Sequence, residues 1–421
     1  MSTPGSDLAD NIVQEEEPKH IARRRDDFMP WHKVRKQFIR ERQWNFETAK
    51  LVKRYLKLQT DPTDWSFDAE NDDPHDPFDD IPEEIRIERP LNCLVVPGDD
   101  LLDVRSLWQS LRPHNCYMRY LGFNEGHGSN QLDTRVHVAN NEVTSLDKVM
   151  RDSQVLHGPF QAIASENSQA YQYLKKYGPF HVVNLDICDS LFPTTTNDPS
   201  DYFGALHRLA EYQMKNQRTP WLLFITTQVE PGSVSAEGLQ KLCQPTRSNC
   251  DSYPDFATKL GTLVPMEAFQ TSDSVIEISA LDDESLIRVF GVALGKWLMQ
   301  LAISANPNWI VVMLTSHSYR IKVDPRVDML SLAFQFRPKL SPPVDSTGLS
   351  NVTVKLPTFP SELESAMKLV HAVEHISDVD ELLRANTELH TQMETASADL
   401  LEAAGFDREK YFAWLRSGQA D

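Results

Sequence analysis

The sequence has 421 residues, of which 40% are hydrophobic, and a formal net charge of −19. At about 100–200 residues per domain, this length predicts two or three structural units. The composition is that of a globular protein, and the acidic balance excludes a protein that coats nucleic acid over its whole surface, though not a local basic patch.

Neither a membrane span nor a secretion signal is expected. No run of about 18 uncharged apolar residues occurs, and the N-terminus is polar and acidic rather than charged and then apolar. The five cysteines are scattered and form no C-x-x-C pair, which argues against a zinc knuckle or a disulfide framework. We therefore expect a cytoplasmic protein with reduced thiols.

Residues 1–60 predict a basic helical arm. Between residues 19 and 57, thirteen Lys and Arg stand against four Asp and Glu, with aromatic residues interleaved. After Pro30, Val34, Phe38 and Ile39 fall on one helical face. One interpretation is that the arm binds nucleic acid, with its cations on phosphates and its aromatics on unpaired bases. The candidate residues are Arg23, Arg24, Arg25, Trp31, Lys33, Arg35, Lys36, Arg40 and Arg42. The alternative is that the arm docks on an acidic surface of this protein or of a protein partner.

Residues 61–90 predict an extended linker. Twelve Asp and Glu stand against one Arg between residues 61 and 88, and four prolines interrupt the run. Proline and like charges disfavour both helix and strand.

Residues 91–340 alternate short apolar runs with helical stretches, which is typical of βαβ units. Five buried strands are predicted at residues 91–98, 116–126, 159–165, 180–192 and 220–231. The first helix between them has Asp103 as its expected N-cap. A long helix at residues 284–304 precedes strands at residues 308–321 and 327–338, whose short connection requires an antiparallel pair. The predicted fold class is α/β, a doubly wound, mostly parallel seven-stranded sheet with a terminal antiparallel hairpin.

This order of elements resembles the class I S-adenosylmethionine-dependent methyltransferase fold, whose last two strands form such a hairpin. The resemblance covers residues 91–340 and rests on element order more than on motifs. It implies a Rossmann-type domain that binds S-adenosylmethionine beyond the carboxyl ends of the strands.

The resemblance also implies which residues bind the cofactor. Gly98 and Asp99 follow the first strand, where the family has a glycine-rich loop, although this loop holds a single glycine. Asn124 and Glu125 follow the second strand, and Glu125 stands where the family has its ribose-binding acid.

Two aspartates after the fourth strand are the candidate catalytic residues. The family's amino-group methylases carry an Asp/Asn-Pro-Pro-aromatic motif there; Asp186 matches its first position, and the two prolines are absent. Asp186 and Asp189 would orient or deprotonate the acceptor. The alternative is that they cap the following turn and helix.

No metal is predicted. His127, His137 and His157 stand at unrelated spacings and are more typical of ordinary polar residues than of ligands.

The C-terminal part, residues 341–421, predicts a linker followed by helices. Residues 341–360 are rich in proline and serine, and the later residues place apolar side chains on helical faces. These helices would pack on the core or offer a surface to a protein partner. Two functions follow: a methyltransferase acting on or near nucleic acid, or a non-catalytic accessory protein of the same fold that binds a protein partner or nucleic acid. A multi-component bacterial system such as phage defence is one setting for the latter, although no motif points to it.

Overall fold

The computed structural model describes residues 24–60, 90–126, 130–187, 189–192, 201–269, 277–322, 326–339, 347, 349 and 358–417. The acidic run at residues 61–88 lies outside them, as do Arg23, His127 and the turn at residues 323–325.

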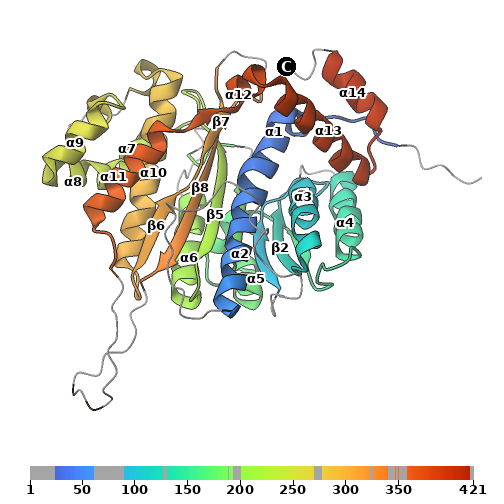
Figure 1. Cartoon of the computed structure of the whole chain (residues 1–421), viewed down its shortest axis with the longest axis horizontal. Helices are drawn as coiled ribbons and strands as arrows, with labels where there is room; N and C mark the ends of the chain where they lie inside the picture. Colours follow the sequence, from blue (N-terminus) through green and yellow to red (C-terminus); the bar gives the residue numbers. More distant parts are fainter. Residues whose placement is uncertain are drawn as a thin grey trace, which may run out of the picture.

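A mixed, mostly parallel sheet organises the chain (Figure 1). Its described strands are β1 (Leu91–Val95), β2 (Met118–Asn124), β3 (Gln154–His157), β4 (Val182–Asp186), β5 (Trp221–Gln228), β6 (Trp309–Met313), β7 (His317–Tyr319), β8 (Met329–Pro338) and β9 (Ser377–Asp378). Their order is β3-β2-β1-β4-β5-β8-β7-β9, with β6 also paired to β8. The first five are parallel, whereas β8 runs antiparallel to β5, β6 and β7. The prediction of an α/β fold with a mostly parallel sheet is confirmed.

The described sheet has nine strands where the sequence predicts seven. The strand expected at residues 308–321 is divided into β6 and β7, because the Ser316 hydroxyl enters the ladder and accepts from the N–H of Ala333 at 3.2 Å. The short β9 then adds to the outer side of β7.

The third strand was predicted in the wrong place. β3 is Gln154–His157, whereas Phe160–Ala164 form a 3₁₀ helix. Pro159 has no N–H for a ladder, and Phe160 and Ile163, three residues apart, both bury their side chains on one side of the tight helix.

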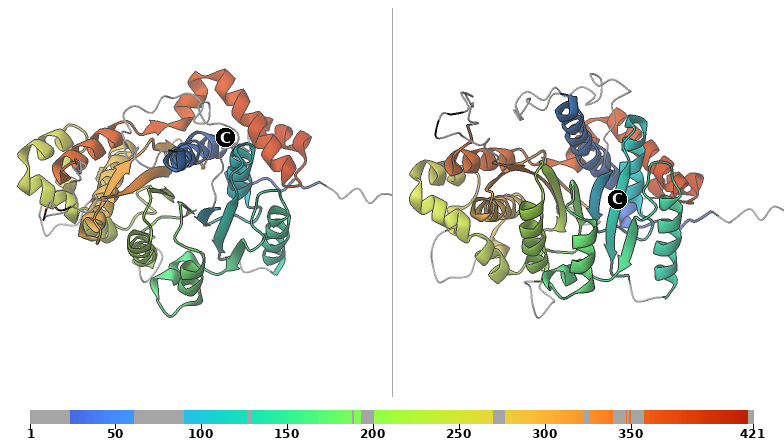
Figure 2. Two further views of the ribbon diagram at one scale, coloured as in Figure 1. Left: turned by 60° about the horizontal axis from the view of Figure 1, so that its bottom comes forward. Right: turned by 90° about the horizontal axis from the view of Figure 1, so that it is seen from below.

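Both faces of the central strands are buried. Successive side chains of a strand point to opposite faces. Leu94, Val183 and Leu223 belong to one apolar cluster, whereas their neighbours Val95 and Leu222 belong to the other. The sheet therefore needs helices on both sides, and Figure 2 shows these two layers.

The first layer contains α5 (Gln169–Tyr177), α6 (Asp201–Asn216), α7 (Ala236–Leu242), α8 (Gln244–Ser252), α9 (Pro254–Gly261), α10 (Asp283–Ser304) and α11 (Glu362–Glu374). Helix α10 is long and apolar enough to cross a membrane, but 72% of its apolar window is buried inside the fold. This burial is typical of a core helix in a soluble protein.

The second layer begins with the basic arm, which is α1 (Val34–Ile39), a π-helical segment (Arg40–Asn45) and α2 (Phe46–Thr60). It also contains α3 (Leu102–Leu111), α4 (Asn130–Thr144), α12 (Val379–Ala385) and α13 (Thr387–Ala403), with α14 (Arg408–Arg416) outside them. Phe38, Ile39 and Val52 of the arm are buried in the core of this layer.

The prediction that Asp103 is the N-cap of α3 was wrong. Leu101, in the left-handed conformation with φ 51°, precedes the helix, and Asp103 lies in its first turn. The carboxylate of Asp103 instead accepts from the Arg40 guanidinium at 2.8 Å, so it is used for a tertiary contact.

Candidate functional site

The loops after β1, β2 and β4 meet at one edge of the sheet, which we call the carboxyl rim. It comprises Gly98, Asp99, Asp100, Asn124, Glu125 and Asp186. In the parallel register Val95 of β1 lies opposite Gly122 of β2 and Asn184 of β4. Gly98, Glu125 and Asp186 follow these three positions within three residues, so the structure brings the predicted site residues to the same edge.

Asn124 ties the first two loops of the rim together. Its Nδ2 donates to the Pro97 carbonyl at 3.0 Å and to Asp99 Oδ1 at 3.3 Å, and its Oδ1 accepts from the N–H of Gly126 at 2.8 Å. Gly98 and Glu125 are exposed. A β-carbon at Gly98 would meet no atom within 4 Å, so no neighbouring protein atom requires glycine there.

The third loop of the rim is bonded to the basic arm. Lys36 on α1 places its Nζ 2.5 Å from Asp186 Oδ1. The lysine side chain is 4% exposed and that of Asp186 is 13% exposed, so this is a buried ion pair. The Lys36 ammonium also lies 4.7 Å from the centre of the Trp44 ring, a cation–π distance.

Burial and the partner's charge act in opposite directions on this pair. Burial lowers the pKa of Lys36, but Asp186, Tyr319 and Asp103 together outweigh burial, so this pKa lies above its ordinary value. Burial raises the pKa of Asp186, and Lys36 opposes that shift. The Lys36 ammonium is the donor and an oxygen of Asp186 is the acceptor of this short contact.

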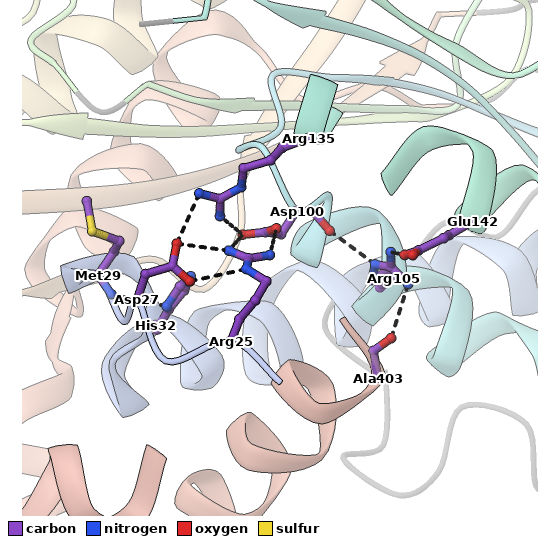
Figure 3. A network of polar contacts seen from close by, with 9 residues as sticks. All are labelled: Arg25, Asp27, Met29, His32, Asp100, Arg105, Arg135, Glu142 and Ala403. Atoms are coloured by element: carbon purple, nitrogen blue, oxygen red, sulfur yellow. Dashed lines mark hydrogen bonds and ion pairs between the residues drawn. The ribbon is translucent and has the colours of Figure 1, made fainter. Parts of the chain in front are cut away.

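Asp100 is the centre of a second ionic network at the rim (Figure 3). Arg25 Nη1 lies 2.5 Å from its Oδ1, and Arg135 Nη2 lies 3.0 Å from its Oδ2. Its backbone carbonyl accepts from Arg105 Nε at 3.1 Å, and Arg105 also pairs with Glu142 at 2.5 Å. Burial raises the pKa of Asp100, and its hydrogen bond to Arg25 opposes the shift.

Most predicted nucleic-acid residues of the arm contact polar groups of the same chain. Beyond the contacts of Arg25, Lys36 and Arg40 already described, the partners are Glu402 for Arg24, the Ile321 carbonyl for Lys33, Asp380 for Arg35 and Gln392 for Arg42. Trp31 is half-buried, and its ring centre lies 6.1 Å from that of His32.

Asp189 lies in a local turn. Its carboxylate accepts from the N–H of Ser190 at 2.8 Å, and its carbonyl accepts from the Thr227 hydroxyl at 3.0 Å. Both polar groups of Asp189 are thus bonded to groups of this chain.

The C-terminal helices hold the beginning of the arm. The N–H of Arg25 donates to the Gly405 carbonyl at 3.1 Å, and the N–H of Asp407 donates to the Arg25 carbonyl at 2.8 Å. The Tyr411 hydroxyl donates to the His32 carbonyl at 2.8 Å. Phe28 stacks on Phe406 with ring centres 5.7 Å apart. The arm, the rim and the C-terminal helices therefore form one packed unit.

Comparison with known families gives a match over this whole unit. A family model described as PP_RS20740-like matches residues 25–416. The chain belongs to the PP_RS20740-like family. No curated protein matches the chain. The description of the PP_RS20740-like family names no activity, so function has to be argued from the residues.

Two cavities of this PP_RS20740-like protein lie away from the predicted cofactor residues. One, of about 350 Å³, lies between α2, β6, β8 and α11. The other, of about 280 Å³, lies between α1 and the C-terminal helices. Neither is lined by Gly98, Asn124, Glu125 or Asp186.

The sequence offered no signal for the Lys36–Asp186 contact, because 150 positions separate the two residues. The sequence analysis also did not single out His371 and His375. His371 and His375 lie one helical turn apart and line the larger cavity, and their i,i+4 spacing was the signal that could have found them.

Proposed function

We propose that this PP_RS20740-like protein is a non-catalytic accessory protein of methyltransferase-type fold, which binds a partner in the cytoplasm. The observation that carries the proposal is the ion pair of Lys36 and Asp186. A carboxylate that orients or deprotonates an acceptor needs its oxygen directed at that acceptor. Here Asp186 Oδ1 accepts a short hydrogen bond from a lysine of the same chain.

The surroundings of this pair support the same proposal. The arm that supplies Lys36 is fastened by Arg25 to Asp100 and by Arg40 to Asp103. Both contacts lie at or beside the loop that would receive the cofactor. The family match includes the arm and the C-terminal helices as well as the sheet, so the segments that contact the rim belong to the matched region.

A methyltransferase acting on or near nucleic acid is the second candidate. It is favoured by the five parallel strands followed by a reversed β8, and by the exposed Glu125 beside the loop that Asn124 holds. In that case S-adenosylmethionine would lie over Gly98 and Glu125, and the basic arm would face the substrate.

Calorimetric titration of the full chain with S-adenosylmethionine separates the two candidates. We expect no saturable heat up to millimolar cofactor, either for the natural protein or for Glu125→Ala. Tight binding that Glu125→Ala abolishes would overturn the accessory role and support the enzyme. Lys241→Gln, an exposed change on α7, serves as the control for binding unrelated to the rim.

A further inference from the structure

The C-terminal end of α11 carries two histidines and a glutamate side by side. The ligand atoms of His371, Glu374 and His375 all lie within 4.8 Å of one another. All three residues are exposed, so an ion from solution can reach them. The prediction that no metal is bound considered three histidines of the N-terminal half, and none of them belongs to this cluster. The cluster also does not include the residues of the carboxyl rim, so its role is independent of the function proposed above.

The helix holds the two imidazoles at a fixed spacing. His371 and His375 are four residues apart, so they lie on one helical face, and their ring centres are 4.3 Å apart. Val370 and Val373 of the same helix are fully buried in the apolar core. Helix α11 packs beside α10 (Figure 1). The backbone that carries the histidines is therefore anchored, although their side chains face solvent.

A hydrogen bond within the helix fixes which ring nitrogen of His375 can coordinate a metal. Its Nδ1 lies 2.8 Å from the carbonyl oxygen of His371. A carbonyl oxygen only accepts, so Nδ1 carries the proton and Nε2 retains its lone pair. Histidines that bind metals almost always donate their second ring N–H in this way, for example to a backbone carbonyl. His375 is thus already in the tautomer that a metal ligand requires.

Two sources of negative charge lie at the cluster. A hydrogen bond from Lys259 lowers the pKa of Glu374, so this side chain is a carboxylate at neutral pH. Its Oε2 accepts from Lys259 Nζ at 2.8 Å and lies 3.7 Å from His371 Nδ1. A carboxylate has about four acceptor sites, so one ammonium does not saturate it. The second source is the end of α11 at Glu374, where the helix dipole places partial negative charge.

Positive charge nearby opposes a metal ion. The groove that the two histidines line also contains Lys50, Arg54 and Arg337. Each of these three is bonded to another side chain of the groove, Lys50 to a glutamate 3.8 Å away and both arginines to the amide of Gln335. Their charge lowers the affinity for a dication. The bonds from two imidazoles and a carboxylate have to exceed this repulsion.

We propose that His371, Glu374 and His375 bind one divalent first-row transition-metal ion such as Zn²⁺. Imidazole nitrogen is a ligand that these ions prefer. Bonds from Zn²⁺ to nitrogen or oxygen are about 2.0–2.2 Å long, which places tetrahedral donor atoms about 3.4 Å apart. Exposed side chains reach this spacing by small rotations about their χ angles. Three protein ligands leave the fourth position to water, so the bound ion stays open to a further ligand from solution.

Calorimetric titration of the full chain with zinc chloride tests the proposal, with the protein prepared without a histidine tag. We expect saturable one-to-one binding of Zn²⁺ and no binding of Mg²⁺, which prefers oxygen ligands. His371→Gln and His375→Gln should each weaken Zn²⁺ binding by more than about tenfold, because even the outer partners of metal ligands contribute about 10–100-fold. Both residues are exposed, so neither substitution disturbs the core.

Two further variants separate the cluster from incidental binding by one surface histidine. Lys259→Gln removes the ammonium that shares Glu374, and should strengthen Zn²⁺ binding about two- to fivefold, the contribution of an exposed ion pair. His390→Gln is the matched control. His390 and Glu394 also lie one turn apart, on α13, with Nδ1 3.6 Å from Oε1, but they offer a single imidazole. This variant should leave Zn²⁺ affinity unchanged.

The proposal is overturned if millimolar Zn²⁺ gives no saturable heat, or if Mg²⁺ binds as tightly as Zn²⁺. It is equally overturned if His371→Gln or His375→Gln binds Zn²⁺ as tightly as the natural protein. Unchanged affinity in Lys259→Gln would remove Glu374 from the ligands, and a loss in His390→Gln as large as in His371→Gln would place the ion elsewhere. None of these results depends on S-adenosylmethionine, so they leave the proposed accessory function untouched.

Discussion

Lys36 of the N-terminal arm and Asp186 at the end of β4 form a buried ion pair, with Nζ 2.5 Å from Oδ1. This contact joins the most basic segment of the chain to the sheet edge where a Rossmann-type fold places its ligand. Removing two charges from water costs several kcal/mol per ion, which the pair recovers only while both partners are present. The arm is therefore part of the folded body.

Nucleic-acid binding by the arm should be weak. Arg25, Lys36 and Arg40 bond to carboxylates of the same chain, and an oligonucleotide would have to displace them. Fluorescence anisotropy measures the affinity for single- and double-stranded oligonucleotides at about 50 and about 200 mM salt. We expect no affinity that decreases steeply as the salt concentration rises. Steep salt dependence that Arg24→Ala and Arg42→Ala reduce would support the nucleic-acid interpretation instead.

Three buried histidines make the protein sensitive to acid. Burial lowers the pKa of His32 from 6.5 to about 3, and those of His181 and His317 to about 4. The backbone N–H of Met29 donates to His32 Nδ1 at 3.1 Å, which requires the neutral ring. Below pH 6.5 the unfolded chain takes up protons that the folded chain does not, so the stability that is complete above this pH is lost as pH falls.

Each of these histidines should lower the free energy of unfolding by about 1.4 kcal/mol for each pH unit between its unfolded and its folded pKa. Urea unfolding at about pH 7 and about pH 5 measures this loss. The His32→Gln variant should lose about this much less unfolding free energy per pH unit than the natural protein. The contributions of the carboxylates are the same in both proteins and cancel in the comparison. Equal pH dependence of the two proteins would mean that His32 takes up its proton as readily in the folded chain as in the unfolded chain.

Two glycines of α10 test how α11 is docked. A β-carbon at Gly295 would lie 2.5 Å from Leu369 Cδ1, whereas one at Gly291 would meet Val373 at an ordinary 3.4 Å. Gly295→Ala should therefore destabilise by about 1–3 kcal/mol through overpacking. Gly291→Ala should be neutral or stabilise by up to about 1 kcal/mol, because alanine favours helix. Equal effects in thermal or urea unfolding would place α11 farther from α10.

The strands and their buried faces were predictable because each is a short apolar run in the chain. The boundary near Pro159 was predicted wrongly, since the apolar run Phe160–Ala164 suits a buried 3₁₀ turn as well as a strand. The roles of Asp103 and Asp186 were not predictable. Their partners, Arg40 and Lys36, lie 63 and 150 positions away, and no local pattern records which distant cation a carboxylate will meet. Gly98, Glu125 and Asp186 share one edge because parallel strands must end together.

A double-mutant cycle on Lys36 and Asp186 tests the central claim, that this buried pair joins the arm to the carboxyl rim. Lys36→Met and Asp186→Asn should each lower the free energy of unfolding by about 3–5 kcal/mol, because each leaves a buried partner without its counter-charge. The double variant should cost little more than either single one. The exposed pair of Lys241 and Glu237 on α7, changed in the same way, should show almost no coupling. Additive losses of less than about 1 kcal/mol each at Lys36 and Asp186, the behaviour of a surface pair, would contradict the account.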